Sequence, residues 1–189
     1  ALEAIKAGYE KVILRLKVNG IKSDPFASAQ GVKQGCPLSP TLYGIFGEAF
    51  ADLVDALDAH IPGYMSVEAC PVVDGLRIPL LLYADDLTLF ARSRSRMERL
   101  LEVLSRWCET FGMHVNVKKT EMLEVAPSPE IRRRMRKLPP LQMVSHEDGC
   151  ATYKQIEVVD RARYLGIHYG TNTSFVSCTK ELLNVGQRA

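Results

Sequence analysis

The sequence predicts an α+β fold in which antiparallel strands pack on amphipathic helices. In two segments, residues 40–57 and 95–111, apolar side chains recur at helical spacing. Short alternating or apolar runs separated by turn residues lie around these segments, and this pattern is typical of strands joined in hairpins. With 189 residues, 47% of them hydrophobic, the chain is long enough for one core of ordinary size.

The first strands are expected close to the N-terminus. Residues 11–18 alternate well enough between apolar and polar side chains for a half-buried strand, and Asn19-Gly20 follows them. Asn-Gly is a favoured pair in two-residue hairpin turns, so we expect the chain to return through Ile21 toward Phe26.

The first long helix should begin at the end of the glycine-containing segment 31–40. Ser39 suits the N-cap, and Pro40 suits the first helical position, where the fixed φ of proline is tolerated. The apolar positions of this helix are Leu42, Ile45, Phe46, Ala49, Phe50, Leu53 and Leu57. Residues 58–75 contain several prolines and glycines and are expected to be irregular.

Residues 78–91, IPLLLYADDLTLFA, predict a buried strand, an acidic turn and a second buried strand. Asp85 and Asp86 would sit at the tip of this hairpin. A second helix over residues 95–111 should end at Gly112, because glycine favours the left-handed conformation that terminates helices. Its inward face comprises Met97, Leu100, Leu101, Leu104, Trp107 and Cys108.

The last third of the chain changes in character. Residues 127–149 contain a dense basic run, Arg132 to Lys137, followed by Pro139-Pro140, and are interpreted as a basic linker or insertion. Further strands are expected near Val115 and at residues 122–125, 156–159 and 163–169.

Composition and charge exclude several classes of protein. The net charge of +2 does not by itself indicate a partner. The five scattered cysteines form no Cys-x-x-Cys pair, which argues against structural zinc and a disulfide framework. No apolar run reaches the roughly 18–20 residues of a membrane span. We expect an intracellular protein, with nucleus or cytoplasm left open, and we interpret the chain, which begins at Ala1 without Met, as a fragment.

The adjacent carboxylates of Asp85 and Asp86 are the strongest chemical signal. Their apolar flanks make paired negative charge costly, because desolvation and mutual repulsion both oppose ionisation. Mg²⁺ prefers carboxylate oxygens, and two such ions about 4 Å apart can hold both reacting oxygens of a phosphoryl transfer. Spacing alone leaves a solvated hairpin tip as the alternative.

Four ordered motifs strengthen the chemical interpretation. They are Gln30 to Pro40 (QGVKQGCPLSP), Tyr83-Ala84-Asp85-Asp86, Lys119-Thr120-Glu121 and Tyr164-Leu165-Gly166. In this order they resemble the reverse transcriptase palm of non-LTR (LINE-type) retrotransposons, over nearly the whole chain as far as about Tyr169. The strings from Trp107 to Thr120 resemble the LINE branch more than group II intron or retron enzymes. The resemblance implies a palm-like antiparallel sheet packed on helices, in incomplete form.

Each motif carries an implied role. Asp85 and Asp86 would be the catalytic metal ligands at the 3′ end of the primer. The implied nucleotide and template contacts are Tyr83, Gln34, Gly35 and Lys119, and the implied primer grip is Tyr164, Leu165 and Gly166. A capped loop-to-helix turn remains the alternative for Gln34-Gly35. Lys118 is a second match for the basic residue near the triphosphate, and a solvent-facing lysine is the alternative for both.

Two basic groups are candidates for contact with the nucleic-acid backbone. Cationic side chains attract phosphate without reading sequence, and their contribution falls with salt. The first group is Arg92, Arg94, Arg96 and Arg99, directly after the acidic hairpin. The second is the run from Arg132 to Lys137, and a solvated helix face is the alternative for both groups.

The chain departs from the family pattern upstream of Gly31. The family's other catalytic aspartate lies on a strand there, whereas Glu3 and Glu10 fall in a helix-like stretch and Asp24 stands beside Pro25. We therefore expect residues 1–126 to form a partial palm without that strand and without fingers. Residues 127–149 would be the linker, and residues 150–189 the end of the palm with the primer-grip hairpin and the start of the thumb.

The resemblance implies an RNA-directed DNA polymerase, with two Mg²⁺ ions in the complete enzyme and Mn²⁺ as a substitute. A primer 3′-hydroxyl would attack a deoxynucleoside triphosphate (dNTP), and the partners would be an RNA template, a DNA primer and dNTP. We expect no membrane or stable protein partner, and no activity of this chain in isolation. The alternative is a degenerate palm that acts as a non-catalytic RNA-binding or interaction module.

Overall fold

The computed structural model describes residues 2–10, 12–28, 31–60, 70–126, 128–147 and 150–171. The chain divides into two compact units, and each is described by itself. Unit 1 comprises residues 1–65 and 78–88, and unit 2 comprises residues 66–77 and 89–189. The predicted start of the thumb falls largely in residues 172–189 and lies outside the described residues.

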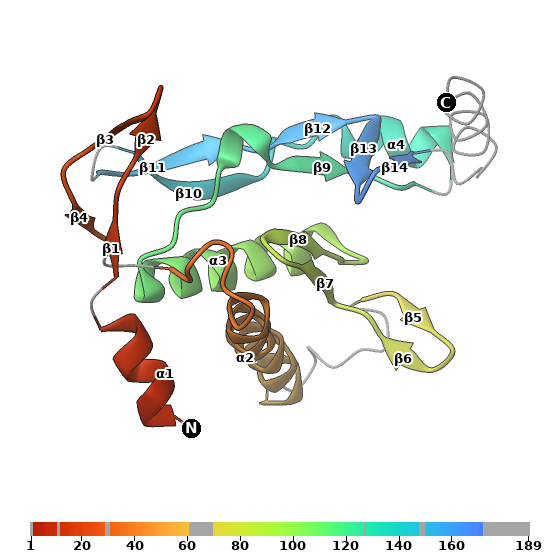
Figure 1. The fold of residues 1–189 in the computed structure, drawn as a ribbon. Coiled ribbons are helices and arrows are strands. Elements are labelled where there is room, and N and C mark those ends of the chain that lie inside the picture. Colours follow the sequence, from red (N-terminus) through yellow and green to blue (C-terminus); the bar gives the residue numbers. More distant parts are fainter. Residues whose placement is uncertain are drawn as a thin grey trace, which may run out of the picture. The chain divides into compact units, whose positions relative to one another are not determined.

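Unit 1 begins with a short helix and two nested strand pairs (Figure 1). These elements are α1 (Leu2–Tyr9), β1 (Ile13–Leu14), β2 (Lys17–Val18), β3 (Ile21–Lys22) and β4 (Phe26–Ala27). The strands β2 and β3 are antiparallel, and so are β1 and β4. Asn19 and Gly20 join β2 to β3 with φ values of 51° and 84°, so the predicted two-residue hairpin is confirmed.

The long helix of unit 1 is α2 (Ser39–His60), which begins where the sequence predicted. Phe50 and Val54 are its most deeply buried apolar side chains, at 3% and 1% exposure. The hairpin β7 (Leu80–Tyr83) and β8 (Asp86–Leu89) follows later in the chain, and unit 1 contains all of it except Leu89.

The burial predicted for residues 78–91 is wrong for β7. Leu81, Leu82 and Tyr83 are exposed at 41%, 38% and 62% of their surface. Within the described ranges β7 is hydrogen bonded to β8 alone, and a sheet of two strands cannot cover both of its faces.

Unit 2 contains the remaining helices and strands of the described residues (Figure 1). In chain order they are β5 (Val72–Val73), β6 (Leu76–Arg77), α3 (Arg94–Phe111), η1 (Val117–Lys119), β9 (Glu121–Leu123), α4 (Pro129–Met135), β10 (Gln142–Glu147), β11 (Cys150–Gln155), β12 (Glu157–Val159), β13 (Arg161–Tyr164) and β14 (Ile167–Gly170). The β10–β11 and β13–β14 pairs are antiparallel, and the β9–β12 pair is parallel. Helices and strand pairs thus confirm the predicted mixed fold.

Helix α3 supplies the core of unit 2. The Ser93 hydroxyl caps it by accepting from the Arg96 N–H at 3.3 Å, and Gly112, with φ of 64°, ends it as predicted. The helix packs against β10. Its buried apolar side chains are Leu100, Leu101, Leu104 and Cys108, and Leu141, Met143 and Ile156, in or beside β10 and β11, are buried as well.

Three sequence-based expectations for loops and strands differ from the structure. Part of the segment 58–75 is regular, because Asp74-Gly75 closes a β5–β6 hairpin with positive φ at both residues. The strand expected near Val115 is absent there, and the chain instead enters the 3₁₀ turn η1. The expected linker 127–149 contains α4 and β10 over its described residues, and the predicted three-part division of the chain stays a prediction. No helix in the described part of the chain is long and apolar enough to span a membrane.

Truncation of Leu100 should reveal how far unit 2 depends on α3. Leu100 is 2% exposed, so Leu100→Ala should lower the free energy of unfolding by about 2–5 kcal/mol through lost burial and a residual cavity. Urea denaturation followed by circular dichroism measures this change. The control is Ile45→Ala in α2, whose side chain is 62% exposed and should cost less than about 0.5 kcal/mol. Equal losses for both variants would contradict this account of the core.

Candidate functional site

The two adjacent aspartates lie at the reversal of the β7–β8 hairpin. Only Ala84 and Asp85 separate the two strands, and Asp86 is the first residue of β8. Both carboxylates are exposed, as a hairpin tip predicts. Ala84 has φ of 50°, a left-handed conformation that costs a residue with a side chain about 1–2 kcal/mol. A tight reversal therefore presents two neighbouring carboxylates to solvent.

Helix α2 approaches the acidic hairpin at Gly47. A Cβ built on Gly47 would lie 3.3 Å from Leu82 Cδ1, closer than most side-chain contacts, so the absence of a side chain allows this approach. Sequence reasoning missed Gly47. The available signal was a glycine inside a predicted helix, where glycine costs about 0.5–1 kcal/mol relative to alanine and so indicates a packing role.

The predicted nucleotide and template residues Gln34 and Gly35 form the centre of a tight turn. The Cys36 N–H donates to the Lys33 carbonyl at 3.2 Å, and Gly35 has φ of 81°. These are the features of a type II turn, which needs a glycine at its third position. Both residues are exposed, and no atom lies within 4 Å of where a Gly35 side chain would start. The side-chain amide of Gln34 and the backbone of Gly35 are thus accessible to a ligand.

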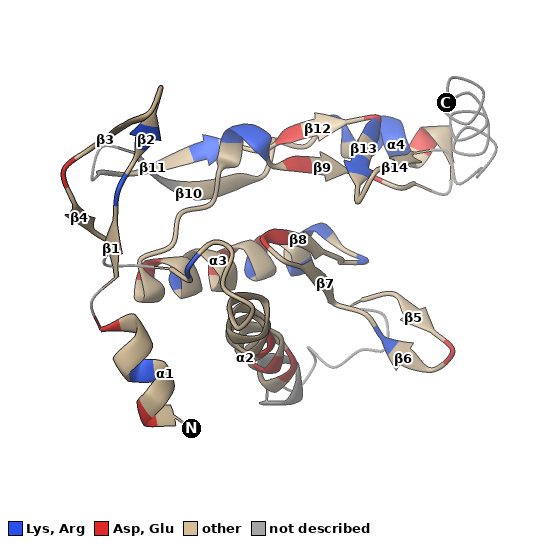
Figure 2. Cartoon of the chain, viewed as in Figure 1, with Lys and Arg blue, Asp and Glu red and all other residues tan. Residues whose placement is uncertain are grey.

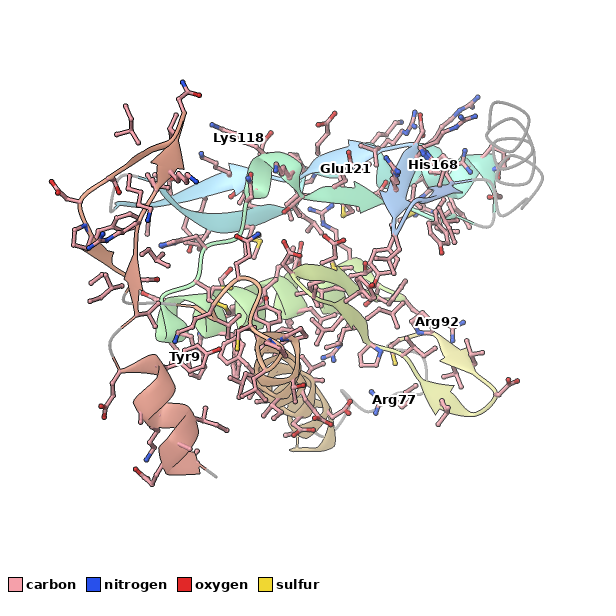
Figure 3. The ribbon with its side chains drawn as sticks, viewed as in Figure 1. Tyr9, Arg77, Arg92, Lys118, Glu121 and His168 are labelled. Carbon is pink, nitrogen blue, oxygen red and sulfur yellow. The ribbon has the colours of Figure 1, made fainter. Side chains whose placement is uncertain are left out.

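A small polar cluster ties this turn to α1 and α2. The Ser39 hydroxyl, predicted as a helix cap, donates to the Lys33 carbonyl at 2.6 Å and lies 3.1 Å from the Tyr9 hydroxyl. The Lys33 ammonium donates to the Gly8 carbonyl at 2.5 Å and stands 5.2 Å from the centre of the Tyr9 ring. Figure 3 labels Tyr9, the residue that ends α1. No pattern in the sequence indicates that Tyr9 contacts the glycine-containing segment.

The Cys36 thiol lies in the same segment, and its surroundings lower its pKa below the ordinary value. The largest cause is the hydrogen bond from the Leu38 backbone, and the Tyr9 and Ser39 hydroxyls add smaller contributions, since each stabilises the thiolate. The pKa of the Cys108 thiol in α3 shifts in the opposite direction, because burial raises it. The two cysteines should therefore differ in reactivity near neutral pH.

The segment predicted as the primer grip is a hairpin. Tyr164 ends β13, Leu165 and Gly166 form the turn, and Ile167 begins β14. Both turn residues have positive φ, at 48° and 84°, and Leu165 is 48% exposed. A leucine in this conformation is strained, and such strain is often kept at functional positions.

The remaining predicted site residues lie in unit 2. Lys119 ends η1 and is exposed. Arg92 is exposed too, and its contact with the nucleic-acid backbone stays a prediction (Figure 3). Arg94 differs, because it pairs with Glu98 at 3.0 Å and donates to the Pro139 carbonyl. Arg96 is only 8% exposed, so this side chain does not fit the predicted role at the surface.

The structure groups the predicted residues by unit. Gln34, Gly35, Tyr83, Asp85 and Asp86 belong to unit 1, whereas the lysine, arginine and primer-grip positions belong to unit 2. Over the described ranges, no three or more His, Cys, Asp or Glu side chains gather into a group that could hold a metal ion. Within this part of the chain, Asp85 and Asp86 therefore belong to no such group.

Comparison with known proteins identifies the family. Residues 1–169 match the family described as Reverse transcriptase (RNA-dependent DNA polymerase). The chain belongs to the reverse transcriptase family. The match includes the acidic hairpin, the Gln34-Gly35 turn and the Tyr164-Leu165-Gly166 hairpin, so the sequence-based identification of the family is confirmed. The roles of the individual residues stay predictions.

Relatives of this reverse transcriptase chain occur in several mobile elements. It is 27% identical to the Pol polyprotein of the type-2 retrotransposable element R2DM of Drosophila melanogaster, over 94% of this chain and 15% of that protein. It is 30% identical to a 149 kDa protein of transposon TX1 from Xenopus laevis, over 63% of this chain and 8% of that protein. It is 26% identical to the RNA-directed DNA polymerase of the mobile element jockey, over 61% of this chain and 12% of that protein. The chain thus spans 15% or less of the length of these relatives.

Exchange of residues between two turns of this reverse transcriptase chain should reveal the strain at Leu165. Asn19 holds the same left-handed position in the β2–β3 turn, and asparagine tolerates it. Leu165→Asn should raise the free energy of unfolding by about 1 kcal/mol, and Asn19→Leu should lower it by a similar amount. Urea titrations give both values. A loss of stability in Leu165→Asn would show that contacts of the leucine outweigh its backbone strain.

Removal of the Tyr9 hydroxyl should weaken the stabilisation of the Cys36 thiolate. Tyr9→Phe should raise the pKa of Cys36, so that the alkylation rate reaches half its maximum at a higher pH. Iodoacetamide labelling across a pH series, quantified by mass spectrometry of the Cys36 peptide, measures the shift. Tyr153→Phe, at a residue 75% exposed in β11, is the matched control and should leave the profile unchanged. Identical profiles for both variants would exclude the Tyr9 contribution.

Proposed function

We propose that this chain forms part of the catalytic palm of an RNA-directed DNA polymerase. The observation that carries the proposal is the exposed Asp85-Asp86 pair at the reversal of the β7–β8 hairpin, within a chain that belongs to the reverse transcriptase family. The reaction is attack of a primer 3′-hydroxyl on the α-phosphate of a deoxynucleoside triphosphate, directed by an RNA template.

The carboxylate oxygens at this turn are ligands of the chemical type that magnesium prefers. Asp85 and Asp86 provide carboxylate oxygens, which hard divalent cations prefer, and their exposure leaves room for water and phosphate oxygens as further ligands. Bound Mg²⁺ or Mn²⁺ would polarise the phosphoryl oxygens and offset the charge that develops in the reaction. A second metal-binding carboxylate strand, which the family resemblance implies, would complete the ligand set.

Other residues of unit 1 position the substrates in this proposal. Tyr83 precedes the turn and is 62% exposed, so its ring is available beside the primer terminus and the incoming nucleotide. Gln34 presents a side-chain amide, and Gly35 leaves its backbone open to bases. Helix α2 supports both features, since it begins four residues after Gly35 and approaches β7 at Gly47.

The lysine and primer-grip positions act from unit 2. Exposed Lys119 would offset charge on the leaving pyrophosphate, as cationic side chains do in phosphoryl transfer. The β13–β14 hairpin, with Leu165 and Gly166 at its turn, would hold the end of the growing strand. The family motif and the exposure of these residues support both proposed roles.

Neutralising the aspartates tests the catalytic proposal. Asp85→Asn/Asp86→Asn should lower primer extension by about 10²–10⁴-fold, because several kcal/mol of charge stabilisation is lost. Extension on an RNA template with Mg²⁺ and deoxynucleotides is measured for the 189-residue chain and for the full-length product of the gene that encodes it. The matched control is Asp74→Asn, an aspartate in the two-residue turn of β5–β6, which should retain activity.

Comparison of the 189-residue chain with the full-length product distinguishes the possible outcomes. Aspartate-dependent extension by the full-length product supports the proposal, whether or not the 189-residue chain extends primers by itself. Extension that survives Asp85→Asn/Asp86→Asn would refute the assigned role. Binding of RNA without extension by either protein would favour the non-catalytic module.

A further inference from the structure

Helix α1 is too short and too exposed to be stable by its own interactions. The structure describes all eight of its residues, and none of them is buried. Isolated helices of fewer than about 12–15 residues are marginal in water. Ile5 and Tyr9 are the half-buried side chains of α1, and they lie four residues apart on one side of the helix. Contacts on this side must therefore hold α1 in place.

The C-terminal end of α1 is capped by Lys33, which lies between β4 and α2 in the sequence. The Lys33 ammonium donates to the Gly8 carbonyl at 2.5 Å and stands 5.2 Å from the centre of the Tyr9 ring. A cation at this end of a helix stabilises the unpaired carbonyls of the last turn. Figure 2 shows basic and acidic positions along α1, and its own lysine, Lys6, is paired with Glu3 at 3.2 Å. The cap thus comes from a residue 25 positions away from Gly8.

A chain of hydrogen bonds runs in the other direction, from Tyr9 to the backbone of the Gln34-Gly35 turn. The Ser39 hydroxyl donates its one proton to the Lys33 carbonyl at 2.6 Å, so it accepts in its 3.1 Å contact with the Tyr9 hydroxyl. Sulfur is a weak acceptor in a protonated thiol, so Tyr9 donates to Ser39 while the Cys36 thiol is protonated. Each bond in such a chain strengthens the next.

Both the side chain and the carbonyl of Lys33 are therefore held by contacts that begin at α1. Lys33 is the first residue of the turn, and its carbonyl also accepts the Cys36 N–H bond that closes the turn, at 3.2 Å. That carbonyl lies in one peptide plane with the Gln34 N–H, so fixing the carbonyl fixes where Gln34 starts. Gln34 and Gly35 are themselves exposed. The described contacts thus hold the turn at its base.

We propose that Tyr9 and Lys33 are positioning residues that hold the Gln34-Gly35 turn ready for the nucleotide and template. With Ser39 they form what we call the turn clamp. A turn that is already ordered loses less conformational freedom when a substrate binds, so the clamp strengthens substrate binding. Gln34 and Gly35 as substrate contacts come from the proposed function, on which this role rests. The Lys33 ammonium acts on α1 and not on a substrate phosphate.

Hydrogen exchange without substrate measures the turn clamp directly. The Cys36 amide of the 189-residue chain reports the turn, because its N–H donates to the Lys33 carbonyl. Tyr9→Phe and Lys33→Met should each speed its exchange about 2–12-fold, the range expected for loss of one hydrogen bond. NMR measures the exchange rate, and circular dichroism confirms that both variants fold.

Two matched variants remove the same groups elsewhere. Tyr153→Phe removes a hydroxyl from a residue 75% exposed in β11, and Lys22→Met removes an ammonium from an exposed residue in β3. Both should leave the exchange of the Cys36 amide unchanged. Equal exchange rates in the clamp variants and in these controls would overturn the turn clamp.

Primer extension by the full-length product tests what the turn clamp does for the substrate. Tyr9→Phe and Lys33→Met should each raise the KM for deoxynucleotide about 2–12-fold and change kcat less than about 2-fold, because the acidic turn keeps its structure. Lys33→Arg retains a cation and a donor and should restore the original KM. Since both residues act through one turn, the double variant should raise KM by less than the product of the two single effects.

Failure of this inference and failure of the proposed function are distinguishable. Faster exchange with an unchanged KM would overturn the positioning role, and so would a fall in kcat with KM unchanged. Independent effects of Tyr9→Phe and Lys33→Met on KM would also contradict it, because Lys33 would then act on the substrate itself. If the original full-length product extends no primer, the proposed function fails, whereas faster exchange in both variants still supports the turn clamp.

Discussion

The two-residue turn is the constraint on which the candidate site depends. A connection of only two residues between twisted antiparallel strands requires a left-handed backbone at its first position. Four such turns occur among the described residues, at Asn19-Gly20, Asp74-Gly75, Ala84-Asp85 and Leu165-Gly166. Asparagine and aspartate tolerate that conformation, whereas alanine and leucine are strained in it. The strained turns are the two that carry the Asp-Asp and Tyr-Leu-Gly motifs, and strain of this kind is typical of functional positions.

Strand pairs of this size need support, because an isolated two-stranded hairpin is at best marginally stable in water. For the acidic hairpin, α2 supplies it at Gly47, where the missing side chain lets the helix approach Leu82. For the β13–β14 hairpin, α4 supplies it through Arg132 and Arg136. In both units a helix therefore fixes the strands that carry the family motifs, and the reactive or basic groups remain exposed.

Acidic and basic side chains are concentrated in different parts of the chain. The carboxylate pair of unit 1 and the exposed Arg161 and Arg163 of unit 2 each lie on a hairpin with a two-residue turn, yet they have opposite sign. A carboxylate pair attracts a divalent cation, and arginines attract phosphate. A polymerase needs both attractions, because its substrates are polyanions whose reacting phosphate must be neutralised locally.

The sequence by itself determined the α+β class, the helix ends at Ser39 and Gly112, and the family, because periodicity, capping residues and ordered motifs are local signals. It also placed Asp85 and Asp86 at a turn. Only the tertiary structure decided that Arg96 is buried and that Arg94 is paired with Glu98, that β7 stays exposed, and that Tyr9 and Gly47 belong to the site. It also joined the basic run to β13–β14. Such properties depend on which distant segments meet, and a single sequence without long-range contacts does not encode them in any local pattern.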